Sequence, residues 1–332
     1  MAYSTLRRSL AEPNCRTYFG GSLLAWTGMW MQRVAVGWMA WELTESTFWI
    51  GVVAFADLVP AIVVSPLAGA IADRADRLRL TVGTQLANIA QAMVLAILAA
   101  AHLLNIHVLV LLALILGITG AFAQPARQSM VPALVPRELL PSAVALNSLT
   151  FNLARVLGPG LAGPLIVVIG PVPTVIANAL ACTFATATLL LLKIDASERI
   201  GHAPTRSLWE ETIEGFTYAA RHKGIGPLFL YAALLGVLVR PFQEMLPAYA
   251  DQVFGRGADG LAWLTGTVGF GALVMGLVVA GQGQVAGLSR RAIVSGAAMT
   301  VAVLAFAATS NFLLGLAACF AAGAAMTVHG IS

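Results

Sequence analysis

Long apolar runs separated by short polar breaks extend along the whole chain. No Asp, Glu, Lys or Arg occurs from Leu80 to Gln124, and none occurs from Val156 to Leu192. A helix needs roughly 20 apolar residues to cross a bilayer, so each of these runs is long enough for two helices. Natural breaks fall at 102–107 and at 170–173, where polar residues or glycine and proline cluster. The pattern predicts an all-α polytopic membrane protein.

The spacing of the apolar runs predicts about ten membrane-spanning helices. In chain order, the expected spans are 18–43, 49–71, 80–101, 107–126, 143–168, 171–192, 226–250, 260–281, 291–309 and 312–331. The longest polar segment separates six spans from four. We therefore expect an N-terminal six-helix bundle at 1–192, a cytoplasmic linker at 193–225 and a four-helix C-terminal bundle at 226–332.

The linker itself carries a helix-start pattern, because Ser207 is followed three residues later by Glu210. Apolar residues after it share one helical face, which is typical of an amphipathic helix. We expect this helix to lie on the cytoplasmic membrane surface, and binding of a soluble partner is the alternative.

Composition and charge agree with a membrane protein. Hydrophobic residues make up 59% of the chain and charged residues 10%, and the mean hydropathy is +0.84. A soluble domain has nearer a quarter charged residues. The net charge of +4 does not indicate nucleic-acid binding, because the arginines and lysines gather in alternate loops. By the positive-inside rule, these loops and the N-terminus are cytoplasmic.

The sequence contains no pattern typical of an enzyme. The three cysteines, Cys15, Cys182 and Cys319, are far apart, and the histidines are scattered, so neither set has metal-ligand spacing. No glycine-rich loop ending in Gly-Lys-Ser/Thr occurs, so no ATP site is expected. We predict no cofactor, no metal and no catalytic residue.

Charge is concentrated between the second and third expected spans, in the stretch GAIADRADRLRL at 69–80. The residues that define its spacing are Gly69, Asp73, Arg74, Arg77 and Arg79. Charges at a water boundary can simply fix the topology of a loop. The alternative is a functional cluster, in which Asp73 pairs with Arg77 and, across the bundle, with Arg127 at the inner end of the fourth span.

This loop spacing resembles the signature of the major facilitator superfamily of secondary transporters. Two departures are Asp76, where the signature usually has glycine, and Leu78, in a usually basic position. RVLGPGLAGP at 155–164 is similar to the Gly-Pro motif of the superfamily's exporters. The segment 124–155 resembles the branch that includes the enterobactin exporter and macrolide efflux proteins.

The resemblance implies a major facilitator fold in a bacterial inner membrane and no enzymatic activity. It implies ion-driven efflux of an amphipathic drug-like or siderophore-like molecule by alternating access, with the 69–80 loop locking the cytoplasmic gate. Import by the same fold, or a non-transporting membrane or partner-binding component, are the alternatives. Because the family has twelve spans, the resemblance also implies that the last two helices are lacking.

Five ionisable residues fall well inside the expected spans rather than near their ends: Arg33, Asp57, Arg155, Arg240 and Glu244. Each costs roughly 2.5–3.5 kcal/mol at the bilayer centre, so each is expected to face the bundle interior. Arg240 and Glu244 are four residues apart and can pair within one helix. Asp57 and Glu244 are the candidates for proton coupling, and permanent structural ion pairs are the alternative.

Further polar and aromatic residues share the faces of these charges. Trp26, Trp30 and Arg33 lie within a narrow arc of the first span. The expected substrate cavity is lined by Trp26, Trp30, Arg33, Asn152, Arg155, Arg240 and Gln243. Ordinary helix packing is the alternative for the aromatic stripe. Close helix packing is expected at Gly158, Pro159 and Gly163, against the glycines of the eighth span.

Overall fold

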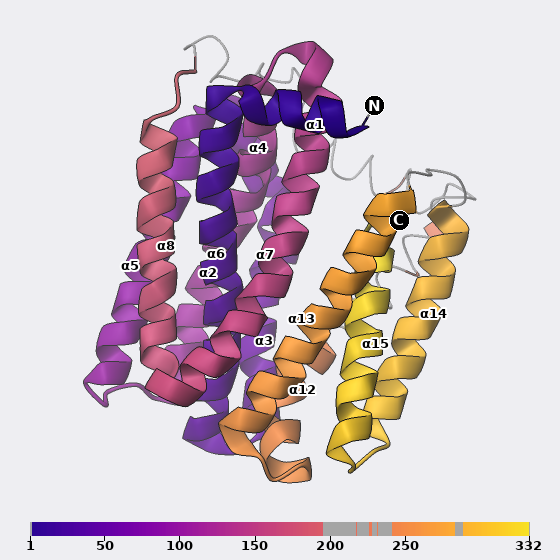
Figure 1. The fold of residues 1–332 in the computed structure, drawn as a ribbon. Helices are drawn as coiled ribbons and strands as arrows, with labels where there is room; N and C mark the ends of the chain where they lie inside the picture. Colours follow the sequence, from indigo (N-terminus) through magenta and orange to yellow (C-terminus); the bar gives the residue numbers. More distant parts are fainter. Residues whose placement is uncertain are drawn as a thin grey trace. The chain divides into compact units, whose positions relative to one another are not determined.

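The computed structural model describes residues 2–194, 217, 226–227, 231, 241–282 and 288–331. Every regular element in these residues is helical (Figure 1). The elements up to the long polar segment are α1 (Ala2–Ala11), α2 (Pro13–Thr44), α3 (Thr47–Val63), α4 (Ser65–Arg74), α5 (Arg77–Ala100), α6 (Ile106–Met130), η1 (Val131–Leu134), η2 (Arg137–Leu139), α7 (Leu140–Ile169) and α8 (Pro171–Leu190). The later elements are α12 (Pro241–Ala248), η3 (Tyr249–Val253), α13 (Gly257–Gln282), α14 (Leu288–Ala307) and α15 (Phe312–Ile331).

Seven stretches of the described chain are long and apolar enough to cross a bilayer. They are Arg77–Ala100, Ile106–Leu134, Arg137–Ile169, Pro171–Leu190, Gly257–Gly276, Arg290–Ala307 and Phe312–Gly330. A shorter apolar helix occupies Thr47–Pro60. These stretches confirm the prediction of an all-α polytopic membrane protein.

The contacts divide the chain into two compact units. Unit 1 comprises Met1–Gly28, Val52–Phe151 and Val175–Ala232, and unit 2 comprises Met29–Gly51, Asn152–Thr174 and Ala233–Ser332. Both α2 and α7 therefore contribute residues to both units. The predicted linker lies outside the described residues except for isolated positions, and so do residues 228–230 and 232–240 of the expected span 226–250.

In unit 1, α6 packs against α4 and α5. One buried apolar cluster of the unit consists of Cys15, Tyr18, Phe19, Leu78, Met130, Leu134, Leu146, Leu189, Leu192 and Ile194. Gly117 of α6 lies against the backbone of Asp57 in α3, where a Cβ atom would collide with the Asp57 carbonyl. The glycine is thus what lets these two helices approach closely.

In unit 2, α15 packs against both α13 and α14 (Figure 1). Gly271 of α13 meets the backbone of Phe320, and Gly323 of α15 meets the backbone of Val268. Small residues at such crossings let helix backbones approach, which is how helices gain packing energy in lipid.

Three features differ from the sequence expectation. The expected span 49–71 is two helices, because Pro60 and Pro66 lack N–H donors and the helix is interrupted at Val64. The end of the expected span 226–250 is a π-helical turn, η3, which begins two residues after Pro247. The short helix α1 was not expected, because a ten-residue segment with two arginines carries no long apolar run.

Candidate substrate cavity

A cavity in unit 2 lies among four helices and brings together several of the predicted substrate residues. Its volume is about 40 Å³, which is smaller than a drug-sized site, so the cavity is narrow in this structure. The lining residues are Trp30, Arg33, Val34 and Gly37 of α2, Arg155 and Pro159 of α7, Gln243, Glu244, Leu246 and Pro247 of α12, and Leu261, Thr265 and Val268 of α13.

The α2 side of the cavity is built by helical spacing. Trp30, Arg33 and Gly37 are three and four residues apart, so they lie on one face of the helix. The Arg33 guanidinium carbon lies 5.2 Å from the centre of the Trp30 ring, a cation–π contact. A Cβ built at Gly37 would lie 3.8 Å from Pro247 Cγ, an ordinary van der Waals distance, so Gly37 faces α12 without a steric need for glycine.

The other two charged groups of the cavity, which have opposite signs, come from α7 and α12. Arg155 and Glu244 are both half-buried and both line the cavity, next to the Gln243 amide. The cavity thus combines two guanidiniums, one carboxylate and one amide within an otherwise apolar wall. In α12, Pro247 also lines the cavity, two residues before the π-helical turn.

The apolar wall is held by close packing of α7 against α13. A Cβ at Gly163 would collide with Ala262, and one at Gly269 would lie 2.9 Å from the Val156 carbonyl oxygen. The neighbouring Thr265 points its Oγ1 back to the carbonyl of Leu261, 2.7 Å away, so its hydroxyl is bonded within α13. Pro159 of the Gly-Pro motif lines the cavity directly, and Gly158 is buried beside it on α7.

Other predicted residues lie elsewhere. Asn152 is half-buried on α7 in unit 2 but does not line the cavity, and Arg240 lies outside the described residues. Asp57 is half-buried on α3 in unit 1. Trp26 belongs to unit 1, where its ring packs edge-on against Phe151 at 5.5 Å between centroids.

Unit 1 contains a second, smaller pocket around Arg127. The pocket is lined by Tyr18, Ser22, Ala25, Trp26, Thr81, Gln85, Arg127, Ala185, Thr188 and Leu189. The Arg127 side chain is buried and donates a hydrogen bond of 3.3 Å to Gln85 Oε1. Its guanidinium carbon also lies 5.7 Å from the centre of the Trp26 ring. Buried arginine is thus stabilised here by an amide and an aromatic face.

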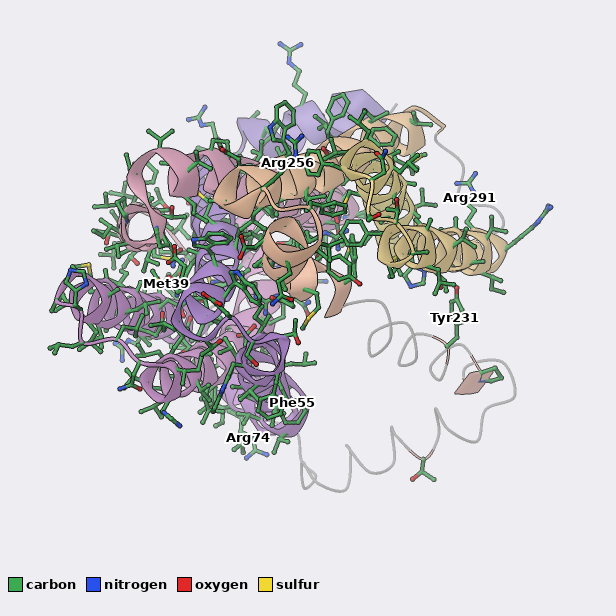
Figure 2. All side chains as sticks on the ribbon, turned by 90° about the horizontal axis from the view of Figure 1, so that it is seen from below. Met39, Phe55, Arg74, Tyr231, Arg256 and Arg291 are labelled. Atoms are coloured by element: carbon green, nitrogen blue, oxygen red, sulfur yellow. The ribbon has the colours of Figure 1, made fainter. Side chains whose placement is uncertain are left out.

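The charged stretch 69–80 comprises the end of α4, the turn at 75–76 and the start of α5. Asp76 caps α5, because its Oδ1 accepts a 3.0 Å hydrogen bond from the Arg79 backbone N–H, and its Oδ2 lies 3.6 Å from Arg79 Nε. Arg77 Nη1 donates a 3.1 Å hydrogen bond to the Ser129 carbonyl, which ties the turn to α6. Arg74 is exposed at the end of α4 (Figure 2).

For two further residues of this stretch, Gly69 and Asp73, the described residues give no contact that supports a role in the gate. A Cβ added at Gly69 would meet open space, so packing by itself does not require glycine at this position. Asp73 is in the last turn of α4, and its side chain lies outside the described part of the structure.

The polar face of α5 is a feature that the sequence expectation missed. Five polar residues of this helix are buried: Thr81, Thr84, Gln85, Asn88 and Gln91. Their spacing of three and four residues on an otherwise apolar helix is the signal that could have identified them. Thr265 and Pro247 of the cavity were also missed, and neither has a distinguishing sequence pattern.

Comparison with known proteins identifies the family of this chain. The family model described as transmembrane secretion effector matches residues 7–329, nearly the whole chain. The chain belongs to this family of the major facilitator superfamily. It is a family of transporters, not of enzymes, and the chain is accordingly a multi-pass membrane protein.

Curated relatives are distant and longer than this chain. The staphyloferrin A transporter of Staphylococcus aureus is 26% identical over 240 residues, covering 71% of this chain and 59% of that protein. The multidrug efflux pump Tap of Mycolicibacterium fortuitum is 29% identical over 299 residues, covering 85% and 70%. Macrolide efflux protein A of Streptococcus pyogenes is 24% identical over 213 residues, covering 64% and 53%. The chain thus spans between 53% and 70% of the length of these relatives.

Solved structures share the fold. The nucleoside transporter NupG superposes with a TM-score of 0.72 at 13% identity, covering 96% of this chain and 81% of that one. A bacterial homologue of the human lysosomal transporter Spinster gives a TM-score of 0.65 at 16% identity, covering 96% and 74%. These likenesses confirm the major facilitator fold expected from the 69–80 loop.

Proposed function

We propose that this chain carries the substrate cavity of a secondary transporter that exports an amphipathic small molecule by alternating access. The observation that carries the proposal is the unit 2 cavity, where Arg33, Arg155, Gln243 and Glu244 meet within apolar walls. Charged groups inside membrane helices are costly and mark substrate or ion pathways. Similarity to a staphyloferrin A transporter, a multidrug efflux pump and a macrolide efflux protein supports export of a similar class of molecule.

We further propose that protons drive this export and that Glu244 or Asp57 carries them. Glu244 lines the cavity, so its protonation changes the charge that the substrate meets. Asp57 lies on α3 in unit 1, and its backbone contacts Gly117 of α6. For export, we propose that the protein lies in a bacterial inner membrane with its N-terminus in the cytoplasm. In this proposal the linker 193–225 joins the helix bundles at 1–192 and 226–332.

The turn between α4 and α5 is proposed as the cytoplasmic gate. The proposed gate residues are Gly69, Asp73, Arg74, Arg77, Arg79 and Arg127. The Arg77–Ser129 hydrogen bond supports a role in holding the ends of α5 and α6 together. Arg77→Gln is expected to weaken this contact and to raise leak of substrate in a flux assay, whereas Arg137→Gln, at an exposed position in η2, is the matched control.

The test of export uses the 332-residue chain in proteoliposomes with an imposed pH gradient. Radiolabelled staphyloferrin A and a radiolabelled macrolide serve as probes. The direction of flux is measured in vesicles with the pH gradient imposed in one direction and then in the other. Gradient-dependent movement of either probe, toward the outer face of the protein, is expected. Glu244→Gln or Asp57→Asn should abolish the gradient dependence, while Glu138→Gln, at an exposed position in η2, should not.

Flux of both probes without a gradient, or flux in the importing direction, would contradict the proposed mechanism. If flux in the double variant Asp57→Asn/Glu244→Gln still depends on the pH gradient, neither carboxylate carries the coupled proton.

A further inference from the structure

The sides of the ten-residue helix α1 differ in what they contact. Ser9 is fully buried, whereas Arg7, Arg8, Leu10 and Ala11 are exposed. Residues three apart are neighbours on a helix surface, so Arg7 and Leu10 share one side of α1, and Arg8 and Ala11 share another. Among positions 7–11, the protein itself therefore covers only the Ser9 side.

The Arg8 side of α1 borders a groove of about 430 Å³ next to η2, a 3-10 turn that α1 contacts. The groove is lined by Arg8, Ala11, Glu12, Pro136, Glu138 and Leu139. The Arg8 guanidinium thus shares the groove with two carboxylates of the protein. Arg7 and Leu10 do not line it, so the charge and the apolar surface of their side face the surroundings of the protein.

Three observations support a position of α1 at the level of the lipid headgroups. The helix α2 begins at Pro13 and the expected span at residue 18, so residues 13–17 cover about 8 Å at 1.5 Å per residue. The headgroup region on each side of the hydrocarbon is about 5–8 Å thick. The neighbouring η2 opens the apolar stretch Arg137–Ile169, which is long enough to cross a bilayer. Moreover, α1 runs crosswise to α2, as a helix in the membrane plane does (Figure 1).

The Arg7 and Leu10 side of α1 suits a membrane interface better than water. Leu10 is 42% exposed. In the sequence, Leu6 and Tyr3 precede it by four and seven residues, which is the spacing of an apolar stripe on a helix. An arginine beside such a stripe can lay its aliphatic stem along acyl chains while its guanidinium reaches the phosphates. Helices that lie in the interface combine these two features.

The charge around α1 determines which lipid it suits. Four guanidiniums and two carboxylates lie on α1, on η2 and on the chain between Glu12 and Arg16, which leaves an excess of two positive charges. They are Arg7, Arg8, Arg16, Arg137, Glu12 and Glu138. Both carboxylates line the groove beside Arg8, so Arg7 is the guanidinium of α1 that they compensate less.

We propose that α1 is an in-plane membrane anchor, in which Arg7 binds the headgroup phosphate of an anionic phospholipid and Leu10 enters the boundary of the acyl chains. The lipid surface covers the one side of α1 that carries both charge and exposed apolar surface. The anchor goes beyond the proposed function, because it needs neither a substrate nor a coupling ion.

The test measures which lipids surround position 10. The full chain carries Leu10→Cys as its single cysteine, with the three natural cysteines replaced by alanine, and a nitrobenzoxadiazole fluorophore on that thiol. It is reconstituted in nanodiscs of phosphatidylglycerol and phosphatidylcholine, and one or the other lipid carries bromine on its acyl chains, so quenching reports the local share of each lipid. We expect quenching by both lipids. Phosphatidylglycerol should be enriched about fivefold over its bulk share, which is the effect of one basic residue at an anionic membrane surface.

Variants separate the charge contribution from the apolar contact. Arg7→Gln should remove most of the enrichment and leave the total quenching by the two lipids unchanged. Arg8→Gln should lower the enrichment by less than about twofold, because the carboxylates of the groove already offset Arg8. Arg290→Gln removes the same charge from an exposed position of α14 and is the matched control. High salt should act like Arg7→Gln, because it screens charges at the membrane surface.

Absence of quenching by either brominated lipid would overturn the inference, since water or a soluble partner would then cover this side of α1. Quenching without enrichment of phosphatidylglycerol would also overturn it, and so would an enrichment that Arg7→Gln leaves unchanged. If the label at position 10 disturbs α1, native mass spectrometry of the unlabelled chain decides the question. Wild type and Arg290→Gln should then retain phosphatidylglycerol in preference to phosphatidylcholine, and equal retention by Arg7→Gln would exclude the anchor.

Discussion

The Trp41 indole N–H donates a hydrogen bond of 3.0 Å to Asp251 Oδ2. Trp41 is buried near the end of α2, and Asp251 lies in the π-helical turn η3, so one bond joins segments of unit 2 that are 210 residues apart in the chain. The other tryptophan of this stretch, Trp38, instead donates to Glu42 Oε1 of its own helix at 2.7 Å. The long-range bond is therefore specific to Trp41.

A double-mutant cycle on Trp41→Phe and Asp251→Ala should give a coupling free energy of about 1 kcal/mol, the size of a partly exposed charge-assisted hydrogen bond. Thermal unfolding in detergent, scored by tryptophan fluorescence, measures it. The cycle on Trp38→Phe and Asp251→Ala is the control and should give a coupling near zero. Equal couplings in the two cycles would mean that the Trp41 bond adds nothing to stability.

Gly163 and Gly160 of α7 are expected to respond oppositely to alanine. Gly163→Ala places a methyl group where Ala262 already lies, so it should push α7 and α13 apart and lower stability by about 1–3 kcal/mol. A Cβ at Gly160 meets open space, and alanine is a better helix former than glycine, so Gly160→Ala should be neutral or stabilise by about 0.5–1 kcal/mol. Melting temperatures of the two purified variants test this pair, and a similar loss in both would exclude the packing explanation.

The hydrogen bond from Arg127 to Gln85 predicts a second stability difference. Gln85→Leu leaves a buried guanidinium without this acceptor and should destabilise unit 1 by about 2–3 kcal/mol. Gln85→Glu keeps an acceptor and adds an opposite charge, so it should retain most of the stability. Gln128→Leu changes an exposed glutamine on α6 and should have little effect. Equal melting temperatures for Gln85→Leu and Gln128→Leu would show that the acceptor is dispensable.

Cys15 should react slowly with maleimides at neutral pH. It lies before the first expected span, and burial, with the nearby Glu12 carboxylate, raises the pKa of its thiol to about 11. Because the thiolate is the reactive form, roughly one molecule in a thousand is reactive at pH 8, and the labelling rate should rise about tenfold per pH unit up to pH 10. The measurement uses a chain in which Cys182 and Cys319 are alanine.

Glu12→Gln is the matched change for this thiol. Removing the carboxylate lowers the pKa of Cys15 toward its ordinary value, so labelling at pH 8 should become several-fold faster. A labelling rate that does not depend on pH, or one that Glu12→Gln leaves unchanged, would show that access rather than ionisation limits the reaction.

Apolar run length predicted the positions of the long helices well, since length and hydropathy are local properties of the sequence. The expected span 80–101 is α5 at Arg77–Ala100, and the expected span 312–331 is α15 at Phe312–Ile331. The break within 49–71 comes from two prolines, which act locally because they lack N–H donors. A hydropathy pattern contains no information about N–H donors, so it did not predict this break. The π-helical turn at 249–253 has no hydropathy signal either.

The candidate site was predictable only in part. Periodicity correctly indicates that Trp26, Trp30 and Arg33 share a face of α2, but it does not say which helices cover each part of that face. Over the length of α2 the neighbours change, so Trp26 contacts Arg127 and Phe151 whereas Trp30 and Arg33 line the unit 2 cavity. The identity of the neighbours is a property of the tertiary fold.

The buried polar face of α5 bears on how this chain enters the bilayer during synthesis. Gln91 Nε2 donates a 3.2 Å hydrogen bond to the Leu112 carbonyl of α6, and Gln85 accepts one from Arg127 of the same helix. Either helix alone would bring amides or a guanidinium into contact with lipid tails, at a cost that its partner removes. Because only residues 101–105 separate the two helices, we expect them to leave the translocon together as a hairpin, with the polar groups already satisfied by one another.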